Sequence, residues 1–134
     1  MLEKSDATGT ALLCIDLDGF KAVNDSLGHP VGDEVLKIVA LRMESAAHGA
    51  MVSRLGGDEF TIILPGSDEL EAERIAGLVI DAIRQPAIVD GQRIRIGASV
   101  GIAYAPRDAD NPADLLRRAD QALYIAKAAG RGGA

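Results

Sequence analysis

The chain has 134 residues, 48% of them hydrophobic, and carries a formal net charge of −6. This size and apolar content predict one domain over residues 1–134 with its own core, and no apolar run reaches the roughly 18 residues of a membrane span. The acidic balance and an aromatic content of 3% argue against a nucleic acid polymer as a partner.

The N-terminal part of the chain predicts a short buried strand. Residues 1–6 are too polar for a signal peptide, so a cytoplasmic domain without direct insertion into a membrane is expected. The apolar run 11–17 is typical of a strand buried on both faces, and Cys14 within it is expected to be a packed side chain. Asp16 and Asp18 lie at the end of this strand.

Two helices are expected next. Residues 20–27 have a helical pattern that Gly28 ends, and Pro30 opens a longer helix. The apolar face of the longer helix comprises Val31, Val35, Leu36, Val39, Ala40 and Met43.

A tight hairpin is the most informative local feature. The runs 50–55 and 60–64 have the composition of strands, and Gly56-Gly57 between them supplies the positive φ angles of a two-residue loop. Asp58 and Glu59 follow at the exit of this loop, where two adjacent carboxylates are well placed to hold a metal ion.

The second half of the chain predicts a helix, a second hairpin with a further strand, and a last helix. Asp68 begins the first of these helices in a capping-box pattern, and Asp90-Gly91 is typical of a type I′ turn before a strand over 98–105. Asn111-Pro112 opens the last helix, which Gly130 ends. The expected apolar faces are Leu70, Ile75, Leu78, Val79, Ala82 and Ile83 in the first helix and Leu115, Leu116, Ala119, Leu123 and Ala126 in the last.

This order of elements predicts an α/β fold of the α+β type. A central mixed, largely antiparallel sheet would be flanked by helices, as in ferredoxin-like and polymerase-palm folds. No glycine-rich fingerprint follows the first strand, which argues against a dinucleotide-binding sheet. Palm-type sheets place the end of the first strand beside the central hairpin, so Asp16, Asp58 and Glu59 are expected to converge on one or two magnesium ions. The alternative is that Asp16 is a turn acid and Glu59 a solvated strand residue.

Five motifs in unbroken order carry a resemblance to a known family. They are Asp16-Leu17-Asp18-Gly19-Phe20-Lys21 with Asn24-Asp25, Gly28-His29 with Gly32-Asp33, Arg54 with Gly56-Gly57-Asp58-Glu59-Phe60, Ser99 with Gly101, and Ala119-Asp120 with Lys127 and Gly130-Arg131. In these motifs the chain closely resembles the GGDEF domain of diguanylate cyclases. That family normally also has an upstream helix and an Asp-x-Leu-Thr motif, which are absent before Asp16, so the chain looks like the core of such a domain.

The resemblance implies a cyclase, dependent on Mg²⁺ or Mn²⁺, that joins two GTP molecules into cyclic di-GMP and releases pyrophosphate. Each protomer of a homodimer would bind one GTP. Asp16 and Asp58 would bind the metal, and Leu17 would offer its backbone carbonyl. Glu59 would either bind the metal or activate the 3′-hydroxyl, and the sequence leaves both roles open. Asp58 and Glu59 are therefore the expected catalytic residues.

The resemblance also implies a set of GTP-binding residues, which are Phe20, Lys21, Asn24, Asp33, Gly56, Gly57, Lys127 and Arg131. Within this set, Asn24 and Asp33 would read the guanine edge, and Lys127 with Arg131 would meet the terminal phosphates. Structural alternatives stay open: Asn24 could stabilise a turn, Asp33 could cap a helix, and the two cations could complement a helix dipole.

The chain departs from the family pattern at the product-inhibition motif. Ala47 and Ala50 stand where many members have the Arg and Asp of an Arg-x-x-Asp motif, so no product-inhibition site is expected. Replacing both alanines with Arg and Asp would restore one if both side chains reach the surface. The opening motif resembles versions that precede an EAL phosphodiesterase domain. The alternative function is therefore a catalytically silent GTP-binding module that regulates an attached phosphodiesterase, in a parent protein with a fused EAL or sensor domain.

Overall fold

The computed structural model describes residues 9–48 and 50–129, and all the expected strands and helices are present. In chain order the elements are β1 (Thr10–Asp18), α1 (Phe20–Leu27), α2 (His29–Ala46), β2 (Met51–Gly56), β3 (Glu59–Pro65), α3 (Glu69–Arg84), β4 (Ala87–Val89), β5 (Gln92–Ile94), β6 (Gly97–Ala105) and α4 (Pro112–Ala129). Gly130, which was expected to end the last helix, lies outside the described residues.

The main sheet has four strands in the order β2-β3-β1-β6. The central strand β1 pairs with β3 on one side and with β6 on the other, and each pairing among the described residues is antiparallel. This topology confirms the predicted α+β class, with a largely antiparallel sheet flanked by helices. The strands β4 and β5 form a separate hairpin whose turn residues, Asp90 and Gly91, have φ angles of 51° and 76°, as the type I′ prediction requires.

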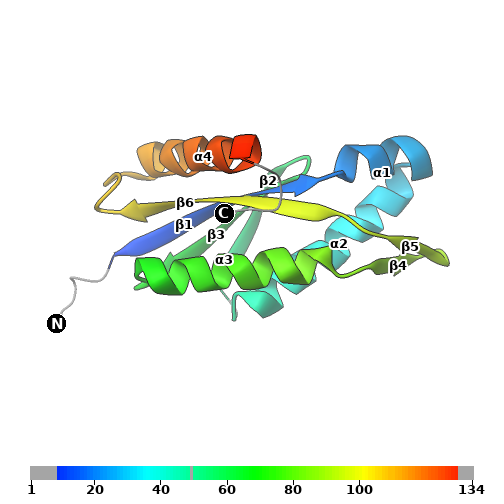
Figure 1. Ribbon diagram of the computed structural model, residues 1–134, viewed down its shortest axis with the longest axis horizontal. Helices are drawn as coiled ribbons and strands as arrows, with labels where there is room; N and C mark the ends of the chain where they lie inside the picture. The colour runs from blue at the N-terminus through cyan, green and yellow to red at the C-terminus, as the bar shows by residue number, and fades with distance from the viewer. Residues whose placement is uncertain (1–8, 49, 130–134) are drawn as a thin grey trace.

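Helices cover both faces of the sheet, as Figure 1 shows, with α4 on one face and α2 and α3 on the other. Alternate residues of β1 therefore enter two cores. Leu13 and Ile15 belong to the larger core beneath α2 and α3, whereas Cys14 packs with Leu123 of α4 on the opposite face. Cys14 is 2% exposed, which confirms it as a packed residue, and burial raises the pKa of its thiol to about 12.

The expected N-terminal caps of two helices are present. The Asp68 side chain accepts a hydrogen bond of 2.8 Å from the Glu71 amide at the start of α3. The Asn111 side chain accepts one of 2.9 Å from the Asp114 amide at the start of α4. The Glu71 carboxylate binds Arg74, one turn further along α3. Glu71 therefore forms an ion pair with a residue of its own helix.

The apolar face of α3 differs from the prediction at two leucines. Leu70 is 78% exposed and Leu78 is 38% exposed, so both were wrongly placed in the core. Small residues occupy part of the face that meets the sheet, because alanines let the helix approach closely. The buried residues of α3 are Ala72, Ile75, Ala76, Val79, Ile80 and Ile83.

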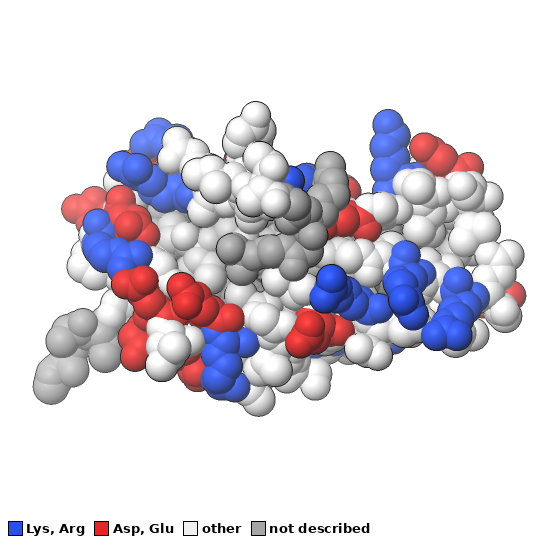
Figure 2. All heavy atoms as spheres, viewed as in Figure 1, with Lys and Arg blue, Asp and Glu red and all other residues white. Residues whose placement is uncertain are grey.

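Charged side chains are unevenly distributed along α3. Figure 2 shows acidic side chains gathered over its N-terminal half, and basic ones over its C-terminal end and the β4–β5 hairpin. Several of the acids are paired within the chain, among them Glu71 with Arg74 and Glu69 with Arg107.

The close packing of α4 on the sheet depends on Gly101 of β6. A Cβ atom at this position would lie 2.1 Å from the Leu123 amide nitrogen and 2.3 Å from the Ala119 carbonyl oxygen. Both atoms belong to the backbone of α4, so no side-chain rotation relieves the contact. Gly101 of the Ser99-x-Gly101 motif is therefore required by the packing of α4.

We expect Gly101→Ala to destabilise the domain by about 3 kcal/mol, because α4 would have to move away from the sheet. A thermal melt should show a fall of about 10 °C. The matched control is Gly77→Ala in α3, where a Cβ atom meets nothing within 4 Å. That change should be neutral or stabilise the domain by up to about 1 kcal/mol. Equal melting temperatures for the two variants would contradict this account of Gly101.

Candidate active site

The end of β1 and the turn between β2 and β3 are held together by backbone pairing. In the antiparallel register of β1 and β3, Asp16 lies opposite Glu59. The Leu17 amide also donates a hydrogen bond of 3.1 Å to the Asp58 carbonyl oxygen. The turn is thereby fixed against the last residues of β1, and the expected proximity of these acids is present.

The turn itself is shifted by one residue from the predicted position. Gly56 pairs with Glu59, so the two-residue loop comprises Gly57 and Asp58, and Asp58 lies within the turn and not at its exit. An irregularity in the pairing between Arg54 and Gly56 causes the shift. Both glycines still have positive φ angles, 154° for Gly56 and 52° for Gly57.

Asp16 and Asp58 form the electrostatic centre of the site. Burial, followed by the charge of the neighbouring Asp16 carboxylate and a hydrogen bond to it, raises the pKa of Asp58. Asp16 accepts a hydrogen bond at Oδ2 from the Lys127 ammonium group of α4. Its Oδ1 atom is buried and has no hydrogen-bond partner. One buried carboxylate oxygen thus lacks the partner that such an atom requires.

Glu59 is also close to several negatively charged side chains. Burial is the largest cause that raises the pKa of Glu59, and the charges of Asp120, Asp16 and Asp58 raise it further. The Lys127 cation acts in the opposite direction. Sequence reasoning assigned no role to Asp120, although its spacing of seven residues from Lys127 places both on one face of α4.

The residues present fit a divalent cation that brings its own further ligands. Within the described part of the chain, no group of three or more His, Cys, Asp or Glu side chains is arranged to hold a metal. The predicted three-carboxylate convergence is therefore only partly realised, with Asp16 and Asp58 adjacent. Magnesium commonly takes one or two carboxylates and completes its shell with water and substrate phosphates. The unpartnered Asp16 Oδ1 atom and the mutual repulsion of the two carboxylates are consistent with such a cation.

Ser99 supports the end of β1 from the neighbouring strand. It is fully buried in β6, lies opposite Asp16 in the register, and donates a hydrogen bond of 2.8 Å to Asp18 Oδ2. Its position in an apolar strand was a sequence signal for a buried hydrogen bond. Asp18 is therefore bound within the fold.

Asn24 of α1 is positioned by the adjacent helix α2. A Cβ atom at Gly32 would lie 1.8 Å from Asn24 Oδ1 and 3.4 Å from the Phe20 ring. The absence of a side chain at Gly32 therefore makes room for the amide. Asn24 Oδ1 is buried without a hydrogen-bond partner, so it is a second polar atom that a ligand could satisfy.

Asp33 is exposed on α2, and it lines a hollow of about 510 Å³ between α2 and β2. The same hollow is lined by Arg54 and Phe60. Arg54 in turn donates a hydrogen bond of 3.0 Å from Nε to the Gly57 carbonyl oxygen. The hollow next to Asp33 thus borders the turn that carries Asp58.

The other predicted residues differ in their exposure. Lys21 is exposed on α1, whereas Phe20 is 4% exposed and belongs to the core, so the Phe20 side chain does not line an open site. Arg131 lies outside the described residues. Ala47 is 4% exposed and packs against the core at the end of α2, so the condition for restoring a product-inhibition site, that both side chains reach the surface, is not met at this position. Ala50 is half-buried.

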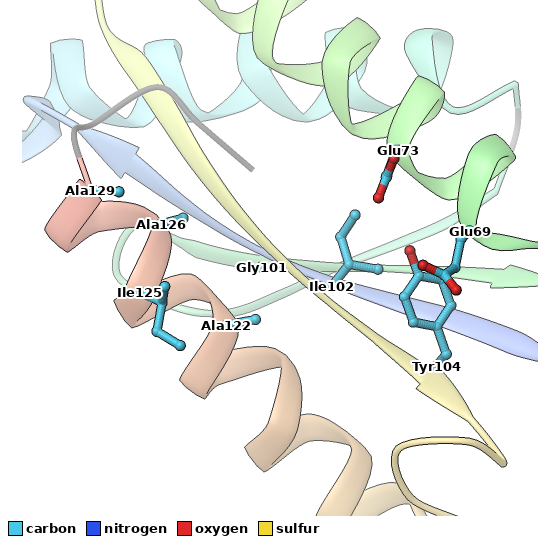
Figure 3. A pocket seen from close by; sticks show the side chains of 9 residues that line it. All are labelled: Glu69, Glu73, Gly101, Ile102, Tyr104, Ala122, Ile125, Ala126 and Ala129. Carbon is cyan, nitrogen blue, oxygen red and sulfur yellow. The ribbon is translucent and has the colours of Figure 1, made fainter.

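A hollow away from the carboxylate site is larger than the one beside Asp33. Its volume is about 610 Å³, and it lies beside β6 between α3 and α4. Figure 3 shows Ile102 and Tyr104 of β6 between Glu69 and Glu73 on one side and Ile125 on the other. Among its described lining residues there is no predicted site residue. The chemistry of the site therefore follows from Asp16 and the turn, and not from the size of a cavity.

Comparison with known proteins identifies relatives of this chain. The family model described as "Diguanylate cyclase, GGDEF domain" matches residues 2–133. The diguanylate cyclase TpbB of Pseudomonas aeruginosa is 44% identical over 125 residues, which cover 91% of this chain and 29% of TpbB. The bifunctional diguanylate cyclase/cyclic di-GMP phosphodiesterase MucR of the same organism is 41% identical over 124 residues, covering 92% of this chain and 18% of MucR.

Solved structures agree with the fold. The crystal structure of the GGDEF domain of TpbB matches with a TM-score of 0.89 and 42% identity, covering 95% of this chain and 81% of that one. The chain spans less than a third of the length of the two curated relatives. Among the described residues, no helix combines the length and the apolar character needed to cross a membrane.

We expect the two glycines of the turn to differ in their tolerance of asparagine. Gly57 has the left-handed conformation that asparagine adopts at little cost, whereas the φ angle of 154° at Gly56 is reached almost solely by glycine. Gly56→Asn should cost about 1–3 kcal/mol locally and lower the hydrogen-exchange protection of the Leu17 amide about tenfold or more. Gly57→Asn is the control and should preserve that protection. Equal loss in both variants would contradict the observed turn geometry.

Proposed function

The chain belongs to the GGDEF domain family of diguanylate cyclases, and we propose that it condenses two GTP molecules into cyclic di-GMP. In this reaction the 3′-hydroxyl of each GTP attacks the α-phosphorus of the other, and each attack releases one pyrophosphate. The proposal rests above all on one observation: Asp16 lies close enough to Asp58 to raise its pKa, and the Oδ1 atom of Asp16 is buried without a hydrogen-bond partner. The identity of 44% to a protein named diguanylate cyclase supports it.

The proposed cofactor is Mg²⁺ or Mn²⁺. Asp16 and Asp58 would hold it through their carboxylates, and the Leu17 carbonyl would complete the protein ligands. When bound, the metal neutralises phosphate charge and lowers the pKa of a coordinated hydroxyl. Glu59 is placed opposite Asp16 across β1 and β3, so it can hold either a metal or the proton of the 3′-hydroxyl.

Lys127 is the proposed partner of the terminal phosphates. In the protein without nucleotide it neutralises Asp16, since its ammonium group donates to Asp16 Oδ2. A cation at the two carboxylates would displace this contact electrostatically and leave Lys127 free to bind a phosphate oxygen. Lys21 on α1 and Arg131 are proposed as further phosphate contacts. No side chain caps α1 in the described structure. The first backbone amides of this helix can therefore bind the same phosphate group.

Asn24 and Asp33 are the proposed guanine-binding residues. An amide and a carboxylate together match the acceptor and donor pattern of the guanine edge. Asn24 Oδ1 is the buried oxygen without a partner, and Asp33 borders the hollow beside the turn. This arrangement provides for one nucleotide in each chain, so the second GTP would come from a second protomer in a homodimer.

A regulatory module is the second candidate. MucR, which is similar over most of this chain, is named for both a cyclase and a phosphodiesterase activity. A GTP-binding domain that has lost turnover would then control an attached phosphodiesterase domain. The two candidates differ in product, because only the cyclase converts GTP into cyclic di-GMP. We also propose that residues 47 and 50 form no product-inhibition site, since neither alanine can pair with guanine or phosphate.

We expect Asp58→Ala to lower cyclic di-GMP formation at saturating Mg²⁺ by at least about 100-fold with little change in melting temperature. The side chain belongs to a turn and contributes nothing to the core. The measurement is mass-spectrometric detection of product from GTP, in the longer protein that contains this domain. Asp81→Ala, which removes an exposed acid of α3, is the matched control and should retain activity. Undiminished turnover in Asp58→Ala would remove this residue from the metal site.

We expect α,β-methylene GTP to bind more tightly than its ATP counterpart, because adenine reverses the donor and acceptor pattern that Asn24 and Asp33 read. Asn24→Ala should weaken the GTP analogue about tenfold. Gly32→Ala should have the same effect without unfolding, because its Cβ atom would occupy the place of Asn24 Oδ1. Ser26→Ala, on the exposed surface of α1, is the control for calorimetric titration. Equal affinities for the two analogues would exclude guanine recognition by these residues.

A further inference from the structure

A second polar hollow lies where α3, the β4–β5 hairpin and the start of β6 meet. Its volume is about 580 Å³. Two arginines, Arg84 at the end of α3 and Arg95 just after β5, contribute to its wall together with Asp18. The other lining residues are Gln85, Pro86, Ile96 and Gly97. We refer to it below as the basic hollow.

The two arginines of the basic hollow have no anionic partner within residues 9–48 and 50–129. This contrasts with the arginines at the opposite end of α3 and on α4. Arg74 binds Glu71, Arg107 binds Glu69, and Arg117 binds Asp114. In a chain whose net charge is −6, two guanidinium groups that face one hollow, without an anionic partner among the described residues, are available to bind an anion.

Arg84 is not needed to bind the carbonyl groups at the C-terminus of α3. Arg42 of α2 already serves the C-terminal carbonyls of α3, because its guanidinium donates to the Gln85 carbonyl and, at 2.9 Å, to the Pro86 carbonyl. Gln85 and Pro86 both line the basic hollow. Arg42 therefore fixes one wall and adds a third positive charge behind it. Figure 2 shows basic side chains clustered over this region.

Asp18, the acid among the described lining residues, is oriented by β6. Asp18 Oδ2 accepts the hydrogen bond of 2.8 Å from Ser99, so this carboxylate is bound to the sheet. Arg84 and Arg95 are both exposed at the rim. The lining thus carries two positive charges against one negative charge, before Arg42 is counted.

We infer that the basic hollow binds a ligand that carries a phosphate group, at a site separate from the candidate active site. Guanidinium groups bind phosphate oxygens through two parallel hydrogen bonds, and the volume lies within the range of small-molecule sites. This inference rests on the proposed function only for the source of the phosphate. The proposed reaction supplies two candidates, pyrophosphate and cyclic di-GMP.

The test is a titration of the ¹⁵N-labelled domain with inorganic pyrophosphate and, separately, with cyclic di-GMP, in the absence of divalent cations. The backbone amides of Gln85, Ile96 and Gly97 report on the basic hollow. We expect them to shift, and we expect Arg84→Ala with Arg95→Ala to raise the fitted Kd at least tenfold. Arg117→Ala with Arg118→Ala removes the same charge from α4 and should change the Kd less than twofold.

A second variant separates charge from geometry. Arg84→Lys with Arg95→Lys keeps both charges but removes the planar guanidinium groups, which can donate two parallel hydrogen bonds to a phosphate. Binding should therefore weaken several-fold while the fold is preserved. Shifts with pyrophosphate show that a phosphate group suffices, and shifts with cyclic di-GMP alone identify a diester ligand; both support the site. The absence of shifts at these amides with either ligand, or equal Kd values in the alanine variant and the control, would overturn it. Cyclase turnover is not measured, so failure of the proposed function would leave this result unaffected.

Discussion

The site depends on the antiparallel pairing of β1 with β3, which brings acidic residues of the two strands and their turn close together. The register places Asp16 opposite Glu59, and the Leu17 amide holds the Asp58 carbonyl. Two like charges in contact near a surface repel by roughly 1–4 kcal/mol. The neighbouring core residues of β1, Leu13 and Ile15, each contribute about 1.5–3 kcal/mol by burial. The contact of Lys127 with Asp16 offsets part of the repulsion, and the buried residues of β1 keep the strand in the sheet.

The same constraint explains why α4 must lie so close to the sheet. Lys127 is the cation that contacts Asp16, and it reaches that carboxylate from the last turn of α4. The helix can approach because Gly101 presents no side chain to the backbone of Ala119 and Leu123. A larger residue in β6 would thus alter the electrostatics of Asp16 through packing alone. Core geometry and site chemistry are linked by one glycine.

Local signals predicted most of the fold correctly. The caps at Asp68 and Asn111 and the Asp90-Gly91 turn depend on residues within a few positions of one another, so their signals are complete in the sequence. The failures concern tertiary contacts. The one-residue shift of the turn follows from the pairing irregularity before Gly56, and no local pattern encodes it. Leu70 was misplaced because apolar character alone does not fix the buried face of a helix: the buried residues of α3 follow the spacing of Ala72, Ile75 and Val79, and Leu70 lies outside that stripe.

The candidate site was predictable in its residue types and only partly in its geometry. Asp16 and Asp58 were named from the ends of two elements, and the sheet brings them together. Asp120 was missed because its effect on Glu59 acts across the gap between α4 and β3, far apart in sequence. The exposure of Ala47 was left open by the sequence, because the direction of a residue after a helix depends on tertiary packing, and at the end of α2 this residue is buried.

The proposed active site and the basic hollow share a short structural connection. Asp18 lines the hollow and is bound by Ser99, which lies opposite Asp16 in the sheet. Coupling between two sites requires that a ligand at one changes the energy of a contact at the other. An anion beside Arg84 and Arg95 would add negative charge close to Asp18, and Asp18 can respond through the hydrogen bond from Ser99. Because Ser99 is fully buried, it has little freedom to move independently of β6. A phosphate in the basic hollow would therefore affect β6, the strand that pairs with β1 beside Asp16, and not only an isolated surface side chain.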